Sequence, residues 1–282
     1  MPTFQNNATL TFNGRSVLSN TVTGEINNVL TGTKTAPVSV YRPGDRITYV
    51  VNLVNAGNTA LTALTVTDDL GAYAFGGGTL IPLTYIDDSV ALFVNGTPQA
   101  APAAEVQDGE LVVSGITVPS DGNAAIVYVT EVNEYAPLGE GATVVNTASV
   151  TGDGVVAPLS LTATITADGT ANLSVLKSLS PSSVVGGGQI TYTFEISNSG
   201  PSPVSATDEV TLTDVLNPVL SDLTVAYNGE ILSAGADYTY ENGTLTVLAG
   251  SITLPAATCA QSETGEWVVT PGVGTLTVTG SV

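Results

Sequence analysis

The chain has 282 residues, 43% of them apolar, and is rich in Gly, Pro, Thr and Val, which excludes a disordered tail and favours strands and turns over helices. Its 5 Lys and Arg against 25 Asp and Glu give a formal net charge of −20, which excludes a basic surface for nucleic acid or for an anionic membrane. Because it has no His, the usual general base and the commonest metal ligand are missing, and we expect no metal, no other cofactor and no conventional enzyme.

Residues 1–24 alternate like a β-strand ahead of the first domain. Side chains two positions apart in a strand share a face, and the more apolar face of this segment carries Phe4, Asn6, Ala8, Leu10 and Phe12. A related stretch, "VVNTASVTGDG", recurs inside the chain, where alternation again places an amide, Asn146, on the apolar face. The segment therefore resembles the closing strand of a domain.

Residues 25–167 and 168–282 are two copies of one unit. "YRPGDRITYVVNLVNAGNTALTALTVTDDL" matches "VVGGGQITYTFEISNSGPSPVSATDEVTLTDVL", with Ile47 aligned to Ile190. Both copies continue with an Asn-Gly pair, in "FVNGTPQA" and "AYNGEILSA", which favours a tight hairpin turn. Alternating strands separated by turn signals predict an all-β chain with two immunoglobulin-like antiparallel β-sandwich domains in tandem.

The second copy lacks its last strand. The first copy continues through "GATVVNTASVTGDG" and "APLSLTATITADG", whereas the second finishes with "GTLTVTGSV" at Val282. Such a sandwich has an unpaired strand edge and an open apolar groove, which a strand from another chain satisfies. We expect residues 1–24 to be an N-terminal donor strand that completes the second domain of a neighbour, head to tail. The alternative is that the strand folds back onto its own second domain and closes a monomer.

The chain has only two lysines, one in each copy and in register. Lys34 lies thirteen positions before Ile47, and Lys177 lies thirteen positions before Ile190. Strand alternation places each lysine on a mainly apolar face, together with one aspartate per copy, Asp68 or Asp214. Each completed domain is thus expected to enclose one Lys, one Asp and one Asn, the last being Asn146 in the first domain and a neighbour's Asn6 in the second.

These three residue types predict an isopeptide bond. Burial disfavours the charged forms, so a neutral lysine amine can attack the amide carbon of Asn while a protonated Asp polarises the carbonyl and relays protons. We expect Lys34 to be joined to Asn146 within a domain, with Asp68 as catalytic acid, and Lys177 to be joined to Asn6 between subunits, with Asp214 in that role. The alternative interpretation is an ordinary buried ion pair of Lys with Asp.

The stretches "YRPGDRITYVVNLVNAGNTALTALTVTDDLG" and "VVNTASVTGDG" resemble the conserved repeat of bacterial surface proteins that is described as an isopeptide-forming fimbrial domain. The resemblance implies immunoglobulin-like modules in extracellular stalks, adhesins and fibres, cross-linked from an early Lys to an Asn in the last strand. Lys34, Asp68 and Asn146 match that pattern, as do Lys177 and Asp214. The chain lacks a signal-peptide pattern, a bilayer-spanning stretch and a sortase-type sorting signal. In that respect it resembles a subunit of endospore appendages.

The sequence thus favours a structural subunit of an extracellular or spore-surface filament. Its expected partner is itself, as a head-to-tail homopolymer, with no nucleic acid and no membrane; anchor or tip proteins are not identified by the sequence. The alternative is a monomeric surface adhesin that recognises a sugar or a host protein through loops such as "AYAFGGGTLIPL". The single Cys259 either links subunits by a disulfide or is inert.

Overall fold

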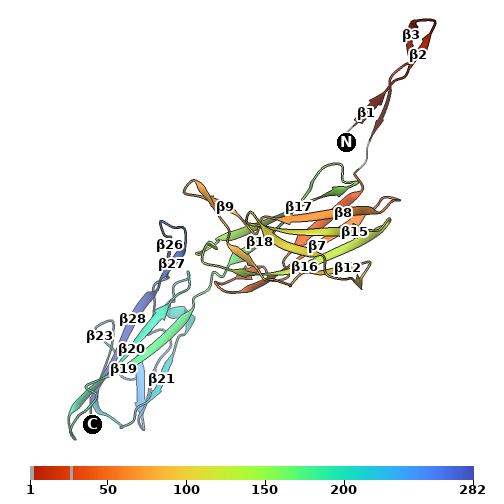
Figure 1. Ribbon diagram of the computed structural model, residues 1–282. Helices are drawn as coiled ribbons and strands as arrows, with labels where there is room; N and C mark the ends of the chain where they lie inside the picture. The colour runs from red at the N-terminus through yellow and green to blue at the C-terminus, as the bar shows by residue number, and fades with distance from the viewer. Residues whose placement is uncertain (1–2, 26–27) are drawn as a thin grey trace. The chain divides into compact units, whose positions relative to one another are not determined.

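The computed structural model describes residues 3–25 and 28–282, and Figure 1 shows β-strands joined by turns and loops. The only helical element within these residues is a short 3₁₀ turn, Ala206–Asp208. No helix in the described part of the chain is long and apolar enough to cross a membrane. The predicted all-β fold is confirmed. The chain forms two compact units, which are Met1–Ala136 with Thr143–Thr166, and Pro137–Ala142 with Ala167–Val282.

The first module is a sandwich of two sheets. One sheet has the order β13-β12-β16-β7-β5, with β11 also paired to β16; its strands are β5 Leu30–Thr35, β7 Arg46–Asn55, β11 Leu83–Tyr85, β12 Ala91–Val94, β13 Thr97–Pro98 and β16 Gly122–Val132. The facing sheet has the order β14-β15-β8-β17-β18-β6; its strands are β6 Val40–Tyr41, β8 Leu61–Asp68, β14 Ala103–Gln107, β15 Glu110–Val118, β17 Thr143–Asp153 and β18 Leu159–Ala167. A small hairpin, β9 Tyr73–Phe75 with β10 Gly78–Leu80, extends from this module.

Alternating burial explains why these segments form a sandwich. Strand β7 buries every second residue from Ile47 to Asn55, and β16 does so from Gly122 to Val132. On the facing sheet, β17 buries Val144, Asn146, Ala148 and Val150, while β18 buries Leu161, Ala163 and Ile165. The last two strands therefore close the core of the first module.

The second module repeats one sheet but only part of the other. Its larger sheet has the order β19-β20-β28-β22-β23, with strands β19 Leu173–Ser180, β20 Gln189–Asn198, β22 Ser221–Tyr227, β23 Glu230–Ile231 and β28 Gly272–Ser281. The facing sheet has three strands in the order β21-β25-β24, which are β21 Leu212–Val215, β24 Tyr238–Glu241 and β25 Thr244–Val247. A separate hairpin joins β26 Thr258–Gln261 to β27 Trp267–Thr270.

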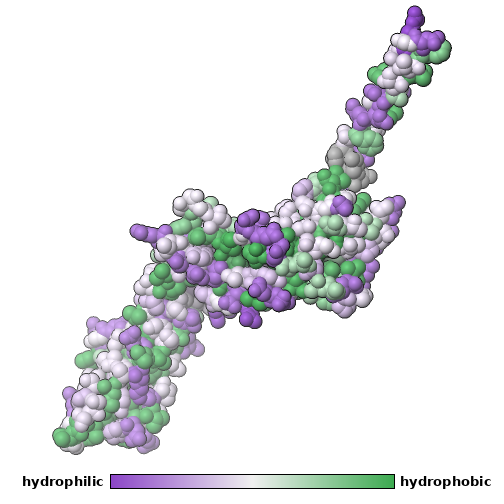
Figure 2. Space-filling model, in the orientation of Figure 1, coloured by the Kyte–Doolittle hydropathy of each residue, from purple (hydrophilic) through white to green (hydrophobic). Residues whose placement is uncertain are grey.

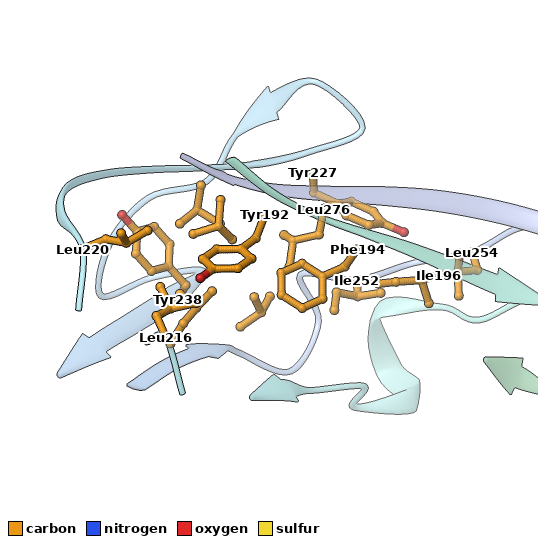
Figure 3. Packing of buried hydrophobic residues seen from close by; sticks show 14 of the residues in the cluster. Tyr192, Phe194, Ile196, Leu216, Leu220, Tyr227, Tyr238, Ile252, Leu254 and Leu276 are labelled. Atoms are coloured by element: carbon orange, nitrogen blue, oxygen red, sulfur yellow. The ribbon is translucent and has the colours of Figure 1, made fainter. Parts of the chain in front are cut away.

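A compact apolar core nevertheless holds the second module together. Tyr192, Phe194 and Ile196 of β20 pack with side chains from both sheets, and Figure 3 shows them beside Leu216, Leu220, Tyr227, Tyr238, Ile252, Leu254 and Leu276. Each of these residues is less than 9% exposed. The module is therefore folded although residues 167–282 contain no counterpart of β17 or β18.

The N-terminal segment is a hairpin with two arms. Its first arm, β1 Thr3–Asn6 and β2 Thr9–Phe12, contains the predicted donor strand; its second arm is β3 Arg15–Leu18 and β4 Val22–Glu25. Strand β1 pairs with β4 and β2 pairs with β3, and none of the four pairs with another strand in residues 3–25 and 28–282. The turn between the arms is Asn13-Gly14, with φ of 47° and 75°, as a tight hairpin turn requires.

The hairpin keeps its apolar side chains in water. Phe4, Leu10 and Phe12 are each more than half exposed, and so are Val17, Leu18 and Val22 on the second arm. Figure 2 shows apolar and polar side chains mixed along its surface. An isolated two-stranded hairpin has no core of its own, so these side chains are available to a second surface.

Two buried asparagines hold the corresponding corner of each module. Asn55, at the end of β7, donates through Nδ2 to the carbonyls of Thr59, Val118 and Pro119, and its Oδ1 accepts the Gly57 N–H at 2.9 Å. Asn198, the equivalent residue of β20, makes the same type of contacts, donating to Ser202 and Pro255 and accepting from Gly200 and Asn172. The side-chain amide thus replaces backbone pairing where the strand ends.

We predict that Asn55→Ala lowers the free energy of unfolding of the first module by about 1–3 kcal/mol, because buried carbonyls lose their donor. Thermal unfolding of the variant measures the loss. Asn58→Ala, at a nearby exposed position, is the matched control and should unfold like the parent. Equal unfolding temperatures for the two variants would contradict the structural role of Asn55.

Candidate isopeptide sites

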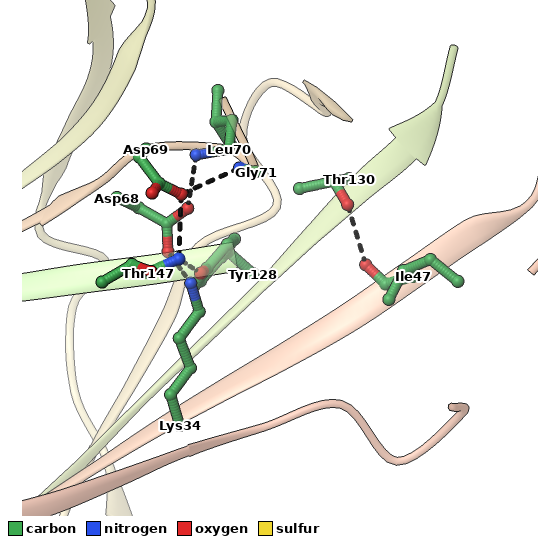
Figure 4. A network of polar contacts seen from close by, with 9 residues as sticks. All are labelled: Lys34, Ile47, Asp68, Asp69, Leu70, Gly71, Tyr128, Thr130 and Thr147. Atoms are coloured by element: carbon green, nitrogen blue, oxygen red, sulfur yellow. Dashed lines mark hydrogen bonds and ion pairs between the residues drawn. The ribbon is translucent and has the colours of Figure 1, made fainter. Parts of the chain in front are cut away.

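The three residues predicted to react in the first module meet in its core. Lys34 lies on β5 in one sheet, whereas Asp68 and Asn146 lie on the adjacent strands β8 and β17 of the facing sheet. The register pairs Asp68 with Ala148, so Asn146 lies two residues further along β17 on the same face. Lys34 Nζ reaches across the sandwich to 2.5 Å from Asp68 Oδ2 (Figure 4). Lys34 is 5% exposed, and Asp68 and Asn146 are fully buried.

The Asp68 carboxylate has hydrogen-bond donors on both oxygens. Oδ1 accepts the Leu70 N–H at 3.0 Å, while Oδ2 accepts both the Lys34 amine and the Tyr128 hydroxyl. The neighbouring Asp69 turns outward and holds β8 to β17, because its Oδ1 accepts the N–H of Thr147 at 2.8 Å. These bonds, drawn in Figure 4, fix the side chain of Asp68 at the lysine.

Two tyrosines complete the wall around the amine. Tyr49 and Tyr128 stack with ring centroids 5.7 Å apart, and Lys34 Nζ lies 5.1 Å from the centroid of Tyr49. Burial raises the pKa of both hydroxyls above the usual value for tyrosine, so both stay neutral, and Tyr128 serves as a hydrogen-bond donor. Tyr128 was not among the predicted site residues, although strand alternation in "AAIVYVTEV" places it on the core face.

Desolvation favours the reactive form of the lysine. Burial lowers the pKa of Lys34, and the attraction of Asp68 opposes that shift without cancelling it. A neutral amine has the free electron pair that nucleophilic attack requires, whereas an ammonium does not. Burial thus favours the nucleophilic form of the Lys34 amine at a position fixed by Asp68.

The amide of Asn146 is buried without a hydrogen-bond partner. Neither its Oδ1 nor its Nδ2 makes a hydrogen bond to any part of the chain that the structure describes, and the Tyr49 hydroxyl is also unpaired there. The amide does lie close enough to both tyrosine hydroxyls to offset part of their pKa rise, but without normal hydrogen-bond geometry. Leaving a buried polar group unpaired costs about 1–3 kcal/mol, so the fold keeps this amide against its own stability.

The geometry suits amide transfer more than a structural ion pair alone. An ion pair needs Lys34 and Asp68 but gives no reason to bury an unpaired Asn146 beside them. A bond from Lys34 to Asn146 would tie β5 to β17 across the sandwich. The structure brings the three residues together, and the bond itself stays a prediction.

The second module contains the same pair in an open state. Lys177 Nζ lies 2.5 Å from Asp214 Oδ2 and 4.4 Å from the ring centroid of Tyr192, the counterpart of Tyr49. However, the side chain of Lys177 is 38% exposed and that of Asp214 is 18% exposed, against 0% and 1% for Lys34 and Asp68.

The exposure follows from unpaired strand edges. In the first module β8 lies between β15 and β17, but within the described residues its counterpart β21 pairs only with β25, so the facing sheet does not extend over β19. Leu30 on β5 is 2% exposed, whereas Leu173, its counterpart on β19, is 41% exposed. We call the uncovered surface the open face; it consists of Leu173, Val175, Lys177 and Leu179 of β19 with Leu212 and Asp214 of β21.

The predicted donor residues lie on the first arm of the hairpin. Asn6 pairs with Val22 and is exposed, as are Phe4, Ala8, Leu10 and Phe12. Lys177, the predicted partner of Asn6, belongs to the other compact unit. A bond between these two residues therefore stays a prediction.

Two other features named in the sequence analysis have plain structural settings. The loop of the adhesin alternative forms the β9–β10 hairpin, and the Tyr73 hydroxyl within it donates to the Tyr135 carbonyl at 2.7 Å. Cys259 lies on β26 as a free, partly buried thiol whose pKa is raised by burial. A raised pKa lowers the fraction of reactive thiolate.

No protein-family model matches the chain, and no curated protein matches it in sequence. Solved structures with a similar fold include BcpA, the major pilin subunit of Bacillus cereus, at 12% identity and a TM-score of 0.35, covering 95% of this chain and 73% of that one. The pilus backbone RrgB of Streptococcus pneumoniae matches at 12% identity with a TM-score of 0.33, and the match covers 86% of this chain and 56% of that one. The collagen-binding subdomain of Enterococcus faecalis ACE matches at 10% identity with a TM-score of 0.32, and the match covers 48% of this chain and 95% of that one. The likeness concerns the β fold alone.

We predict that the intact mass of the folded chain is lower than the sequence mass by one ammonia for the Lys34–Asn146 bond. Asp68→Ala should restore that mass, because the amide then lacks the acid that polarises it. Asp214→Ala, which removes the equivalent carboxylate of the second module, is the matched control and should leave the first-module bond intact. A full sequence mass in folded parent protein would contradict the bond.

Proposed function

We propose that the chain is the structural subunit of a filament at a bacterial cell or spore surface. Each subunit inserts its N-terminal hairpin into the open face of the next, and a bond from Lys177 to the neighbour's Asn6 then locks the junction. One observation carries the proposal: the second module exposes a Lys-Asp pair on an incomplete sheet, and the hairpin has the sequence and pairing of the strands that complete the first module.

The first module supplies the template for the junction. There Asn146 on β17 pairs with Ala163 on β18, and in the hairpin Asn6 pairs with Val22. Both asparagines thus face a small apolar residue on the following arm. Aligning Asn6 with Asn146 also aligns Ala8 with Ala148, the residue that pairs with Asp68 of β8. In the junction, Ala8 would then pair with Asp214 of β21.

Apolar burial drives the insertion. Phe4, Leu10 and Phe12 are largely exposed on the hairpin, and Leu173 and Val175 are largely exposed on the open face. Covering a large apolar side chain stabilises the complex by about 1.5–3 kcal/mol, and strand pairing satisfies the free backbone groups of β21. Because the donor and acceptor surfaces differ, the contact is heterologous and each added subunit offers a new open face.

The same insertion completes the reactive site. Covering Lys177 and Asp214 would give them the dry setting of Lys34 and Asp68 and place the Asn6 amide beside the amine. The Lys177 nitrogen then bonds to Cγ of Asn6, the bond from Cγ to Nδ2 breaks, and Nδ2 leaves as ammonia after Asp214 relays the proton. No external reactant is needed, since one amide is exchanged for another.

A surface location fits this design. A filament that is covalently continuous through amide bonds resists denaturation and force without a disulfide inside each chain, which a single Cys259 cannot form. The charge of −20 keeps the subunits soluble before assembly. Whether the surface belongs to a cell or to a spore is tested by locating the chain with an antibody on growing and sporulating cells.

We predict that a chain without residues 1–24 fails to form filaments, because the open face then has no donor. It should instead bind a synthetic peptide of residues 1–25. The bound peptide should then occupy the open face and prevent the hairpin of an added full-length subunit from inserting there. Electron microscopy and light scattering measure both effects. Filaments of normal length from the truncated chain would rule out this donor.

We further predict that boiling filaments in detergent with reductant leaves a ladder of covalent oligomers. Asn6→Ala should abolish the ladder while leaving noncovalent filaments, because Phe4, Leu10 and Phe12 still cover the open face. Asn7→Ala, which changes the neighbouring side chain immediately after β1, is the matched control and should keep the ladder. Clean monomer from parent filaments would show that no bond joins the subunits.

A further inference from the structure

A segment of the second module, Ser182–Val185, corresponds to an edge strand of the first module. We call this segment the strap. In the first module the corresponding residues include β6, which lies beside β18 at the edge of the sheet. The Thr166 N–H of β18 donates to the Ser39 carbonyl at 2.8 Å, and Tyr41 of β6 is 1% exposed. In the first module, β6 therefore covers the outer edge of the closing strands.

Backbone hydrogen bonds fix the correspondence between the strap and β6. In the first module Gly44 N donates to Val132 O at 2.9 Å, and Val132 N donates to Asp45 O at 2.9 Å. In the second module Gly187 N donates to Val282 O at 2.8 Å, and Val282 N donates to Gly188 O at 3.0 Å. Gly44 and Gly187 are separated by the same interval as the two lysines, 34 and 177, and so are Asp45 and Gly188. Ser182 therefore corresponds to Ser39, and Val184 corresponds to Tyr41.

The strap has no strand to pair with in the described chain. Ser182–Val185 belongs to no β-strand, and Val184 and Val185 are 38% and 80% exposed. Only Val185 of this segment takes part in a turn hydrogen bond, accepting the Gly188 N–H at 2.8 Å. The following Gly186 and Gly187 have no atom near the position of a Cβ, so the chain there is uncrowded. Backbone hydrogen bonds of Gly187 and Gly188 to Val282 hold the chain just after the strap, while the strap itself pairs with no strand in the described residues.

We propose that the strap is a second acceptor edge, which closes over the second arm of the hairpin from the neighbouring copy. This inference rests on the proposed function and adds to it a contact that the first arm does not make. The first arm would pair with β21 as β17 pairs with β8, and the second arm would pair with the strap as β18 pairs with β6. The hairpin is then held between two edges.

The register of the hairpin specifies the contact. Because Asn146 pairs with Ala163 and Asn6 pairs with Val22, Val22 occupies the place of Ala163. Three residues further, Glu25 occupies the place of Thr166. The Glu25 N–H of one copy therefore donates to the Ser182 carbonyl of the next, as Thr166 N–H does to Ser39.

Side-chain sizes in the hairpin differ from those in the closing strands of the first module. The hairpin pairs Phe4 with Gly24 where the first module pairs Val144 with Ile165. The Phe4 ring lies over Gly24, where an added Cβ would come within 2.4 Å of it. The larger side chain of the first arm thus covers the place that Ile165 fills in the first module.

Hydrogen exchange on the full chain tests the contact directly. Asn6→Ala filaments are noncovalent in the proposed function, so the same chain can be studied as filament and as monomer released by dilution. The amide of Val184, which lies on the same side of the strap as the Ser182 carbonyl, should exchange at least tenfold more slowly in the filament, because it pairs with the hairpin. Filaments whose strap exchanges as fast as in the monomer would overturn the strap while leaving the proposed function intact.

Two variants separate backbone pairing from apolar burial. Val184→Pro removes the N–H that a pairing strap presents, whereas Val184→Ala keeps it and trims the side chain. In the Asn6→Ala background we expect Val184→Pro to raise the subunit concentration needed for filaments by about tenfold and Val184→Ala by less. Unchanged assembly of the proline variant, with a monomer that melts like its parent, would overturn the strap. A parent chain that forms no filaments at all overturns the proposed function and the strap together.

Discussion

The structure depends on keeping an amine and a carboxylate inside an apolar sandwich. Lys34 and Asp68 come from opposite sheets and meet at 2.5 Å in the core of the first module, so both sheets must be complete for water to be excluded. Strands β17 and β18 provide that closure and carry Asn146 into the same site. In the second module the same pair is present without those strands, and its lysine is 38% exposed. One arrangement of residues thus exists in a closed and an open form.

Much of this could be predicted from the sequence, because two kinds of pattern carry the information. The constant interval between the copies aligned Lys34 with Lys177, and period-two alternation placed Asp68 and Asn146 on core faces. Tyr128 was missed because alternation shows that a tyrosine is buried but not which oxygen its hydroxyl contacts. The strap was missed for a related reason. Its residues acquire meaning only from the strand pairing of β6 in the first module.

The two modules differ in how they hold the aspartate. Tyr49 pairs across the sheet with Tyr128, whose hydroxyl donates to Asp68 Oδ2, whereas Tyr192 pairs with Val278, which has no donor. Donors favour the ionised carboxylate, while amide transfer needs the protonated acid. The residue that pairs with Tyr192 in the second module thus gives Asp214 no hydrogen bond equivalent to that from Tyr128. In the proposed filament, the second module receives its amide from a neighbouring subunit.

In the proposed filament, exposure separates docking from bond formation. An amine that is exposed to water has to lose its hydration before it can attack a carbonyl, so Lys177, which is 38% exposed, is less reactive while the open face is uncovered. Docking removes water from the same surface that the apolar residues of the hairpin cover, and it brings in the amide at the same time. Burial that drives docking is thus also the change that activates the amine. Wrongly placed subunits can still dissociate, because only a hairpin seated deeply enough to exclude water from Lys177 can be joined to it.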